Sequence, residues 1–389
     1  MVRSDNILVT VFLRGGCDGL NLVGPTGDSI YMAERRTETR VERDGDNPGL
    51  KLGNPIADVD FRFHYKAAAL KELYDANELA VVHACGLTNG TRSHFEAIDF
   101  MERGTPDNKN TSTGWLTRLV AQEHLSGYTP VVSASNGVPI SLLACASAIA
   151  VPNTKRVTLQ GSGYYKGLRE EMLHARYTNT PPISKNGAHT LEVLDVFSSR
   201  LPKDASGKLL DYQPAAGVNY TVEGNNELSN GLKALAQLIK MDVGVRVAMV
   251  DYGGWDTHIG QNGRFPPLVS GLSQALKAFW LDMKSYQDRL TLVVMSEFGR
   301  RLKSNDSGGT DHGHGNVMLV MGGQVNGGHM YGKWPGLSNE QLDNQVDLAV
   351  TTDYRTVLAE IAQNQLPQVN IGKVFPGFTS YQPLNIMRA

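Results

Sequence analysis

The sequence feature that most constrains the fold is a short apolar run that gives way to a glycine-rich polar loop. The run extends from Thr291 to Met295 and is followed by Ser296. A short β-branched run bounded by Ser and Gly is typical of a buried strand. Residues just past such a strand lie at its carboxyl end, where open α/β sheets hold their ligands. The run therefore predicts an α/β fold with a site that begins just beyond Met295.

The loop that follows carries three candidate metal ligands, Asp311, His312 and His314. They lie among glycines, which let the backbone approach a bound group closely. His312 and His314 are two residues apart, so in an extended segment their imidazoles point the same way. Carboxylate and imidazole donors directed at one point suit a divalent cation of the zinc or manganese kind. The loop therefore predicts half of a metal site.

Two other predicted strands end in similar residues. Val245–Val250 leads to Asp256 and His258, which are again two residues apart and among glycines. Ile7–Leu13 leads to Asp18, with glycine close on both sides. Asp18 can either reach into a site at the sheet edge or bond its own backbone in a Gly-Asp turn. The sequence leaves both interpretations of Asp18 open.

A fourth predicted strand, Leu79–His83, precedes a helix start at Ser93. Ser93 and Glu96 have the spacing of a capping box, so Ser93 caps the helix by default. Because the free N–H groups of a helix amino terminus also attract anions, a serine there can cap and attack in the same fold. His94 could be a ligand, but a lone His at a helix start more often packs or caps, so we leave it outside the predicted site.

Because an α/β sheet gathers its strand ends at one edge, we expect these side chains to converge. The set is large enough for two cations, which would hold substrate oxygens, activate a nucleophile and neutralise a leaving group. Arg14, Arg92 and Arg300 lie beside the motifs and could clamp an anionic group, or else pair with nearby carboxylates. The predicted metal ligands are Asp18, Asp256, His258, Glu297, Asp311, His312 and His314.

Composition excludes several classes of protein. The formal net charge is -2, so no nucleic acid or other extended polyanion is implied as a partner. The three cysteines include no CxxC pair, so neither a disulfide framework nor a thiolate zinc site is indicated. No run approaches the roughly 18 apolar residues that a membrane span needs. The sequence predicts a cytoplasmic protein, or a periplasmic or exported one if a signal segment was removed.

The alternation of predicted strands and helices is interrupted between residues 152 and 224. Polar and aromatic residues are mixed there, with scattered helical pattern and no strand-turn-helix rhythm. We interpret 152–224 as an insertion or cap region within a single α/β domain that spans residues 1–389.

Taken together, the motifs resemble the domain-of-unknown-function family numbered 1501, which is grouped with the alkaline phosphatase and sulfatase superfamily. The resemblance implies a doubly wound, mostly parallel sheet with helices on both faces, and metal-assisted phosphoryl or sulfuryl transfer. The matching stretches are Leu13 to Asn21, Ser93 to Ala97, Gly254 to His258, Ser296 to Arg300 and Gly309 to His314.

By this resemblance Asp18 is similar to the first-strand metal carboxylate, and Ser93 to the nucleophile at a helix start. Asp256 and His258 are similar to a first-metal pair, although the superfamily usually spaces these residues like a helical turn. Glu297 stands where the superfamily has Asp followed by His.

Here the residue after Glu297 is Phe298, so one of Asp311, His312 and His314 is expected to supply the missing donor. Cys17 does not lie in a sulfatase modification motif, so formylglycine chemistry is not expected.

The leading hypothesis is a metal-dependent hydrolase of phosphate or sulfate esters, acting on a small anionic ester or a sulfated or phosphorylated carbohydrate. Ser93 attacks, and Arg92 or Arg300 holds the non-bridging oxygens. Zinc or manganese is the expected metal, with calcium, magnesium or iron as alternatives. The rival hypothesis is a non-catalytic, metal-stabilised binding or scaffold relative, which the replacement of Asp-His by Glu297 and Phe298 keeps open.

Overall fold

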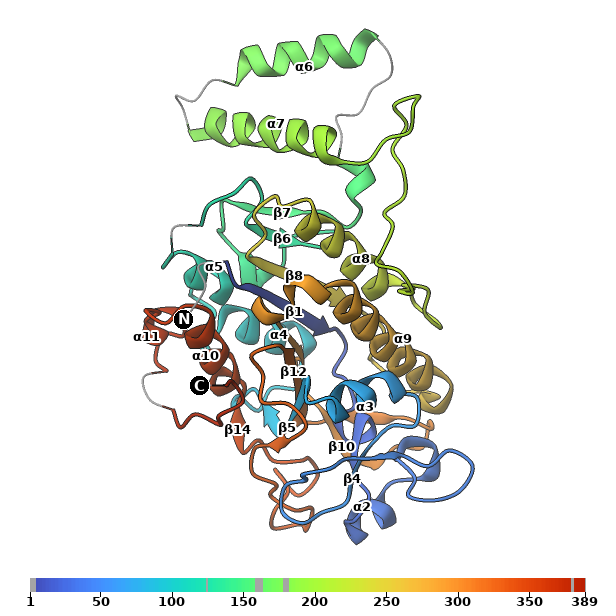
Figure 1. The fold of residues 1–389 in the computed structure, drawn as a ribbon. Helices are drawn as coiled ribbons and strands as arrows, with labels where there is room; N and C mark the ends of the chain where they lie inside the picture. The colour runs from blue at the N-terminus through green and yellow to red at the C-terminus, as the bar shows by residue number, and fades with distance from the viewer. Residues whose placement is uncertain (1–4, 124, 158–163, 178–181, 379–380, 389) are drawn as a thin grey trace.

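The computed structural model describes residues 5–123, 125–157, 164–177, 182–378 and 381–388. Its centre is a nine-stranded sheet with the strand order β13-β5-β12-β9-β1-β8-β6-β7, in which β14 also pairs with β5 (Figure 1). The strands are β1 (Ile7–Leu13), β5 (Leu79–Gly86), β6 (Val131–Ser133), β7 (Ala148–Ala150), β8 (Val247–Tyr252), β9 (Leu290–Ser296), β12 (Asn316–Gly322), β13 (Met330–Tyr331) and β14 (Thr352–Asp353).

The strands from β9 to β7 pair in parallel, whereas β12 is antiparallel to both β9 and β5. The prediction of an α/β fold with a mostly parallel sheet is confirmed.

Strand β1 shows why helices cover both faces of the sheet. All of its residues are buried, and successive side chains of a strand point to opposite faces. Ile7 and Val9 join one hydrophobic core, while Leu8 and Phe12 join a second one. The first core receives α3 (Ala68–Asp75), α8 (Glu227–Lys240) and α9 (Gln261–Asp282), and the second receives α4 (His94–Arg103), α5 (Trp115–Val120) and α10 (Tyr354–Gln365).

The predicted strand at Thr291–Met295 lies within β9, between β1 and β12. In the sheet register, Leu13 at the end of β1 is opposite both Tyr252 of β8 and Ser296 of β9. The segments that leave these three strands therefore start side by side at the same sheet edge.

Smaller elements surround the central sheet. A two-stranded antiparallel sheet, β10 (Arg300–Ser304) with β11 (Thr310–His312), follows β9, and a separate sheet has the order β2-β4-β3. The remaining elements are β2 (Val23–Pro25), β3 (Leu50–Lys51), β4 (Phe61–Phe63), α1 (Gly19–Leu22), α2 (Ser29–Glu34), α6 (Tyr164–Arg176), α7 (Pro182–Arg200), α11 (Ile371–Val374) and the 3-10 turns η1 (Thr37–Thr39), η2 (Ile140–Leu142), η3 (Thr154–Arg156) and η4 (Lys284–Arg289).

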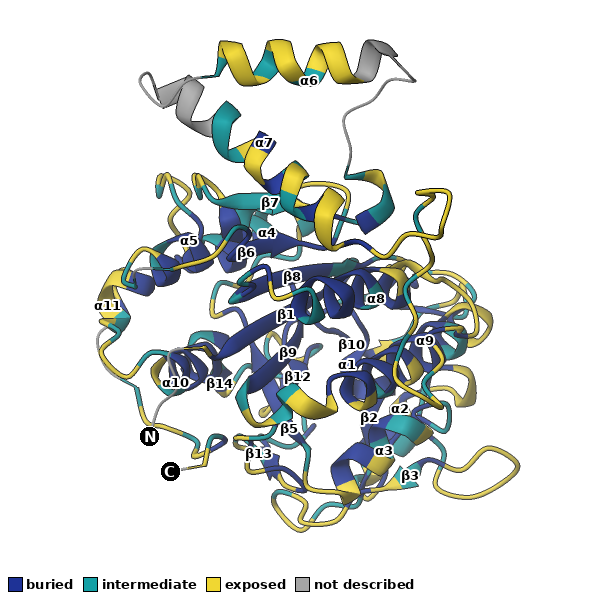
Figure 2. Cartoon of the chain, turned by 45° about the horizontal axis from the view of Figure 1, so that its top comes forward, coloured by how far each residue is buried: buried dark blue, intermediate teal, exposed yellow. Residues whose placement is uncertain are grey.

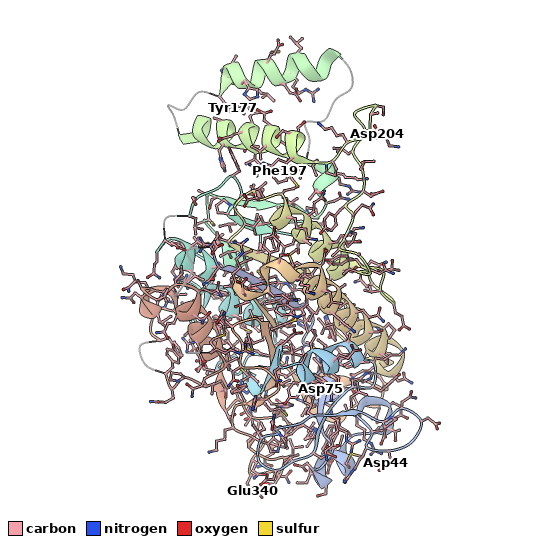
Figure 3. All side chains as sticks on the ribbon, in the orientation of Figure 1. Asp44, Asp75, Tyr177, Phe197, Asp204 and Glu340 are labelled. Carbon is pink, nitrogen blue, oxygen red and sulfur yellow. The ribbon has the colours of Figure 1, made fainter. Side chains whose placement is uncertain are left out.

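The stretch predicted as an insertion contains α6 and α7, which stand beyond the β7 edge of the sheet (Figure 1). Both helices carry many exposed residues (Figure 2). Phe197 of α7 is fully buried and lies on the side of the helix nearest the sheet (Figure 3). The division into one domain with an insertion stays a prediction. Among the described residues, no helix has the length and apolar content that would let it cross a bilayer.

Candidate metal centre

The centre of the site is a group of three side chains from three different elements: His94, Asp256 and His312. His94 is the first residue of α4, Asp256 follows β8, and His312 ends β11. One donor atom from each residue lies within 4.8 Å of the other two. His258 adjoins this group, because its Nε2 atom is 3.2 Å from Asp256 Oδ1 and 2.8 Å from His312 Nε2. The three histidines and Asp256 are called the metal centre below.

The three imidazoles of the metal centre are all held through Nδ1. The Nδ1 atom of His94 is 2.8 Å from Glu297 Oε1, and that of His258 is 3.3 Å from Asp311 Oδ1. The Nδ1 atom of His312 is 2.8 Å from the backbone carbonyl oxygen of Arg92. A carbonyl oxygen only accepts hydrogen bonds, so His312 donates from Nδ1 and its neutral ring keeps a lone pair on Nε2.

The carboxylates of Glu297 and Asp311 favour the same tautomer in His94 and His258, with the proton on Nδ1. Three lone-pair nitrogens are thus directed toward one carboxylate, which is the arrangement of metal-bound histidines with carboxylate or carbonyl partners behind them.

Two contacts show that the metal centre is not satisfied by protein atoms alone. Among the described residues, His94 Nε2 is buried and has no hydrogen-bond partner. His258 Nε2 and His312 Nε2 face each other at 2.8 Å, so two lone pairs would repel unless a proton or a cation lies between them. The donors of one tetrahedral zinc ion lie about 3.3 Å apart, given Zn–N bonds of about 2.0–2.1 Å. The residues therefore fit a divalent cation after a small outward movement of the rings.

Electrostatics favour the ligand forms of two of these residues. Burial lowers the pKa of His312, which keeps its imidazole neutral near pH 7. Burial raises the pKa of Asp256, but the hydrogen bond and charge of Arg300 outweigh it and hold that pKa below the usual value. The hydrogen bond that His94 donates to Glu297 raises the pKa of His94.

Glu297 lies behind His94 and is fully buried. Its Oε1 atom accepts from the Gly15 N–H at 2.8 Å as well as from His94, and its Oε2 atom is 3.0 Å from Ser296 Oγ. Burial raises its pKa, but the bond to His94 and bonds from backbone N–H groups outweigh burial and lower it. Glu297 is thus an anion that is occupied by protein donors, and it contacts His94 rather than the middle of the centre.

Phe298, which stands where the resemblance implies a histidine, contacts two rings of the metal centre. Its ring centroid is 4.9 Å from that of His94 and 4.8 Å from that of His312. Phe298 therefore supports the imidazoles from the apolar side instead of supplying a donor.

Arg300 is almost fully buried and joins the loops that build the site. Its Nη2 atom donates to Asp256 Oδ1 at 2.6 Å and to the Gly15 carbonyl at 2.6 Å, and Nε donates to the Gly16 carbonyl at 2.6 Å. Gly15 has a φ of +120°, and a Cβ atom there would lie 2.5 Å from the backbone nitrogen of Asp256. The loop after β1 is thus pressed against the loop after β8, with Arg300 between their carbonyl groups.

Asp18 lies apart from the metal centre in a buried cluster of its own. Its Oδ2 atom accepts from Arg35 Nη1 and Gln261 Nε2, both at 2.7 Å, and its Oδ1 atom accepts from the Asn21 N–H at 3.2 Å. Of the two interpretations left open by the sequence, the local backbone bond is present, because Asp18 caps helix α1. Its predicted role as a metal ligand stays a prediction.

His314 also turns away from the metal centre. Its Nδ1 atom is 2.8 Å from Asp343 Oδ2, and its Nε2 atom is 2.8 Å from the Leu87 carbonyl oxygen. The expectation that His312 and His314 point the same way is wrong. Strand β11 ends at His312 and the chain bends at His314, so the alternation of an extended segment is lost.

Ser93 and Arg92 lie at the start of α4. The prediction that Ser93 precedes a helix is confirmed, but its side chain is exposed and forms no cap bond. The capping box does not close, because the Glu96 carboxylate accepts from Thr91 Oγ1 at 3.0 Å and Lys109 Nζ at 2.6 Å. Arg92 donates from Nε to Asp347 Oδ2 at 2.8 Å.

His94 is the residue of the metal centre that sequence reasoning left out. It follows Ser93 directly at the end of a predicted strand–helix connection, which is the same topological criterion that selected Asp256 and His258. Applying that criterion to His94, instead of the general rarity of ligands at helix starts, would have found it. Cys17 is buried and burial raises its pKa, in keeping with a thiol that plays no part here.

Comparisons with known proteins agree with the resemblance seen in the motifs. The family described as "Protein of unknown function (DUF1501)" matches residues 81–375. None of the curated proteins matches the chain.

Among solved structures, the chain is similar to the zinc complex of the C-terminal periplasmic domain of EcEptC from Escherichia coli, with 11% identity, coverage of 83% of this chain and 75% of that chain, and a TM-score of 0.36. It is similar to the phosphonate monoester hydrolase SpPMH from Silicibacter pomeroyi, with 10% identity, coverage of 84% of this chain and 69% of that chain, and a TM-score of 0.39. It is also similar to alkaline phosphatase from the Antarctic bacterium TAB5, with 9% identity, coverage of 83% of this chain and 93% of that chain, and a TM-score of 0.32. Likeness at this level does not assign a function.

Proposed function

Because the chain belongs to the DUF1501 family of proteins of unknown function, its activity has to be inferred from its own side chains, and we propose that it is a metal-dependent hydrolase of phosphate or sulfate esters. The observation that carries this proposal is the convergence of imidazole nitrogens on Asp256, each ring being held from behind through Nδ1. Imidazole and carboxylate donors that converge without satisfying one another support a bound cation, and a cation at a sheet edge suits anionic substrates.

In this proposal His94, Asp256 and His312 hold a divalent ion, and His258 is a further donor beside Asp256. Imidazole and carboxylate ligands suit zinc, and three protein ligands would leave a position open for substrate. Manganese, magnesium, iron and calcium remain alternatives because their ligand preferences overlap. When bound, such an ion stabilises negative charge on the substrate oxygens.

The chain's own residues would orient the substrate and the donors. Ser93 is the proposed nucleophile, because its hydroxyl is exposed beside His94 and makes no cap bond. Arg300 orients Asp256, and the Arg92 carbonyl orients His312. Direct contact of either guanidinium group with substrate oxygens stays a prediction, since both already donate to protein acceptors. We further propose that Glu297 positions His94 instead of binding the ion.

A second candidate function is favoured by one specific observation. No hydrogen bond to a described residue orients the Ser93 side chain, as expected if the centre is retained only to stabilise a binding or scaffold protein. A hydrolase that uses water in place of Ser93 is an intermediate case.

Metal analysis combined with an ester panel separates these functions. The substrates are nitrophenyl phosphate, bis(nitrophenyl) phosphate and nitrophenyl sulfate, each with added zinc or manganese. We expect stoichiometric metal, and turnover that falls about 100-fold or more in Ser93→Ala. Ser112→Ala is the matched control, because Ser112 is exposed and lies outside the site.

Each of the other outcomes would support a different function or refute the proposal. Turnover that is unchanged in Ser93→Ala would indicate a water nucleophile. Firmly bound metal without turnover of any ester would indicate the non-catalytic relative. A protein that binds no divalent ion would refute the proposal.

A further inference from the structure

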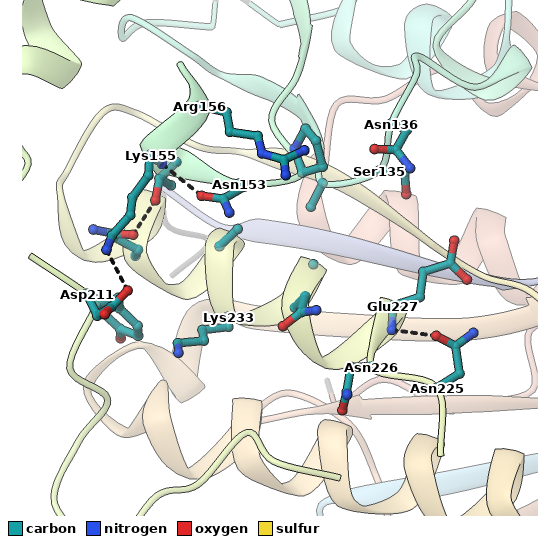
Figure 4. Close-up of a pocket in the computed structure, with 18 residues that line it drawn as sticks. Ser135, Asn136, Asn153, Lys155, Arg156, Asp211, Asn225, Asn226, Glu227 and Lys233 are labelled. Carbon is teal, nitrogen blue, oxygen red and sulfur yellow. Dashed lines mark hydrogen bonds and ion pairs between the residues drawn. The ribbon is translucent and has the colours of Figure 1, made fainter. Parts of the chain in front are cut away.

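A polar cleft of about 610 Å³ is lined by residues of α8, of η3 and of the segments that follow β6 and β7. Figure 4 shows the side chains that line it. Asn136, after β6, and Asn153, before η3, contribute to its wall. The start of α8 adds Asn225, Asn226 and Asn230. This group of five asparagines defines what is called the amide cleft below.

The amide cleft and the metal centre belong to the same sheet edge. Strands β6, β7, β8, β1 and β9 are mutually parallel, so their carboxyl ends lie together. Glu227, which lines the cleft, accepts from the Gly253 N–H at 2.8 Å, and Gly253 precedes Asp256 by three residues. Ser135, also in the lining, accepts from the Asp251 N–H at 2.8 Å. The loop after β8 thus runs from the wall of the cleft to the metal centre.

The asparagines divide into two kinds. Asn153 and Asn225 accept local backbone N–H groups at 2.9 Å, so they shape the loops. The side chains of Asn136, Asn226 and Asn230 make no hydrogen bond to any described residue, and all three are exposed. Each free amide offers two donors and an acceptor, which matches hydroxyl groups that both donate and accept. Amides from separate segments around one cleft therefore suit a ligand with several hydroxyl groups.

The charges in the cleft do not form an anion site. Lys155 Nζ is paired with Asp211 Oδ1 at 2.6 Å, which neutralises both groups. Glu227 contributes one negative charge against the two positive charges of Lys233 and Arg156, so the charged groups of the cleft sum to only +1. Tyr212 adds an aromatic ring, and its hydroxyl is fixed by Asp282 Oδ2 at 2.8 Å. An aromatic ring of this kind packs against the C–H face of a pyranose.

We propose that the amide cleft is a saccharide-binding subsite, and that the ester cleaved at the metal centre is borne by an oligosaccharide. The second half of this statement rests on the proposed function, whereas the binding of a saccharide does not. A chain of sugar units is the ligand class that combines many hydroxyl groups with the length to reach from one part of the sheet edge to another.

Calorimetric titration with maltohexaose, cellohexaose and chitohexaose tests the subsite. We expect saturable binding of at least one of these neutral hexasaccharides, both before and after chelation of divalent metal. Because the probes carry no ester and need no metal, a failure of the proposed catalysis leaves this result unchanged. Saturation by sodium sulfate without binding of any hexasaccharide would overturn the proposal, as would no binding at all.

The double variant Asn136→Ala, Asn230→Ala removes two free amides without removing a hydrogen bond to any part of the fold that the structure describes. We expect it to weaken hexasaccharide binding about tenfold or more, the loss expected for two neutral hydrogen bonds. Asn339→Ala is the matched control, because Asn339 is an exposed asparagine away from the cleft. Unchanged affinity in the double variant would place the saccharide elsewhere and refute the assignment, provided both variants keep the thermal midpoint of the parent.

Discussion

Two polar clusters lie beside the same strand ends, and they differ in how fully their groups are paired. In the first, Asp18 is matched by Arg35, Gln261 and a backbone N–H, so charge and hydrogen-bond capacity are balanced within the protein. In the metal centre, by contrast, His94 Nε2 has no hydrogen-bond partner among the described residues, and His258 Nε2 faces His312 Nε2.

A balanced cluster stabilises the fold, since buried polar groups are stable only when paired. An unbalanced one supports the proposed metal site. The comparison thus assigns opposite roles to residues that look alike as candidate ligands, and the substitutions below test it in order of expected effect.

The largest effect is expected at Asp18. Asp18→Asn leaves the buried Arg35 guanidinium without a counter-charge, which costs about 3–5 kcal/mol of unfolding free energy when a buried pair loses one partner. Denaturant unfolding followed by circular dichroism measures this loss. Metal content of the folded variant should stay at the wild-type level. A variant of normal stability that fails to bind metal would reverse the comparison and make Asp18 a ligand.

Metal removal is expected to have the next largest effect. With free zinc at about 100 times the dissociation constant, the free energy of unfolding of the metal-bound protein should exceed that of the chelated protein by about 2.7 kcal/mol. The gain should disappear in His94→Ala, because that variant lacks one of the three converging donors. Thermal unfolding with and without zinc measures both values. A gain that persists in His94→Ala would show that the ion binds elsewhere.

Glu297→Gln tests whether the residue behind His94 positions it. The amide keeps the shape of the side chain but removes the negative charge that holds His94 Nδ1. Metal affinity should fall about 10–100-fold, the usual effect of losing a partner behind a metal-bound histidine. Competition with a fluorescent chelator measures the dissociation constant. Complete loss of metal binding in a folded Glu297→Gln variant would instead make Glu297 a direct ligand.

Asp311→Asn should have the smallest effect. The bond from His258 to Asp311 is 3.3 Å long and partly exposed, and the amide oxygen of Asn can still accept from Nδ1. We expect metal affinity to fall less than about tenfold, below the range for a buried partner. The same competition assay checks this ranking. A larger loss than in Glu297→Gln would mean that His258, and not His94, is the principal ligand.

Sequence patterns predicted the parts of this molecule that depend on local order. The apolar run at Thr291–Met295 predicted a strand, and its position predicted a sheet edge where Asp256, His258 and His312 meet. Those residues follow or end strands, so topology alone brings them together.

The residues that could not be placed depend on distant partners or on a local bend. The pairing of Asp18 with Arg35 requires the chain to fold back through helix α2 after β2, which no motif near Asp18 encodes. His314 leaves the centre because the chain bends directly after β11. Glu297 contacts His94, which is distant in sequence and was excluded on frequency alone.

The close approach of the loops after β1 and β8 decides where new specificity could arise. Any side chain at Gly15 would collide with the backbone of Asp256, so this position between the two loops does not tolerate substitution. The rim is different: Phe95 is 89% exposed beside His94, and Ile259 is 65% exposed beside His258. If the proposed hydrolysis holds, a directed library at Phe95 and Ile259 is therefore the place to alter substrate preference, with Gly15 kept constant.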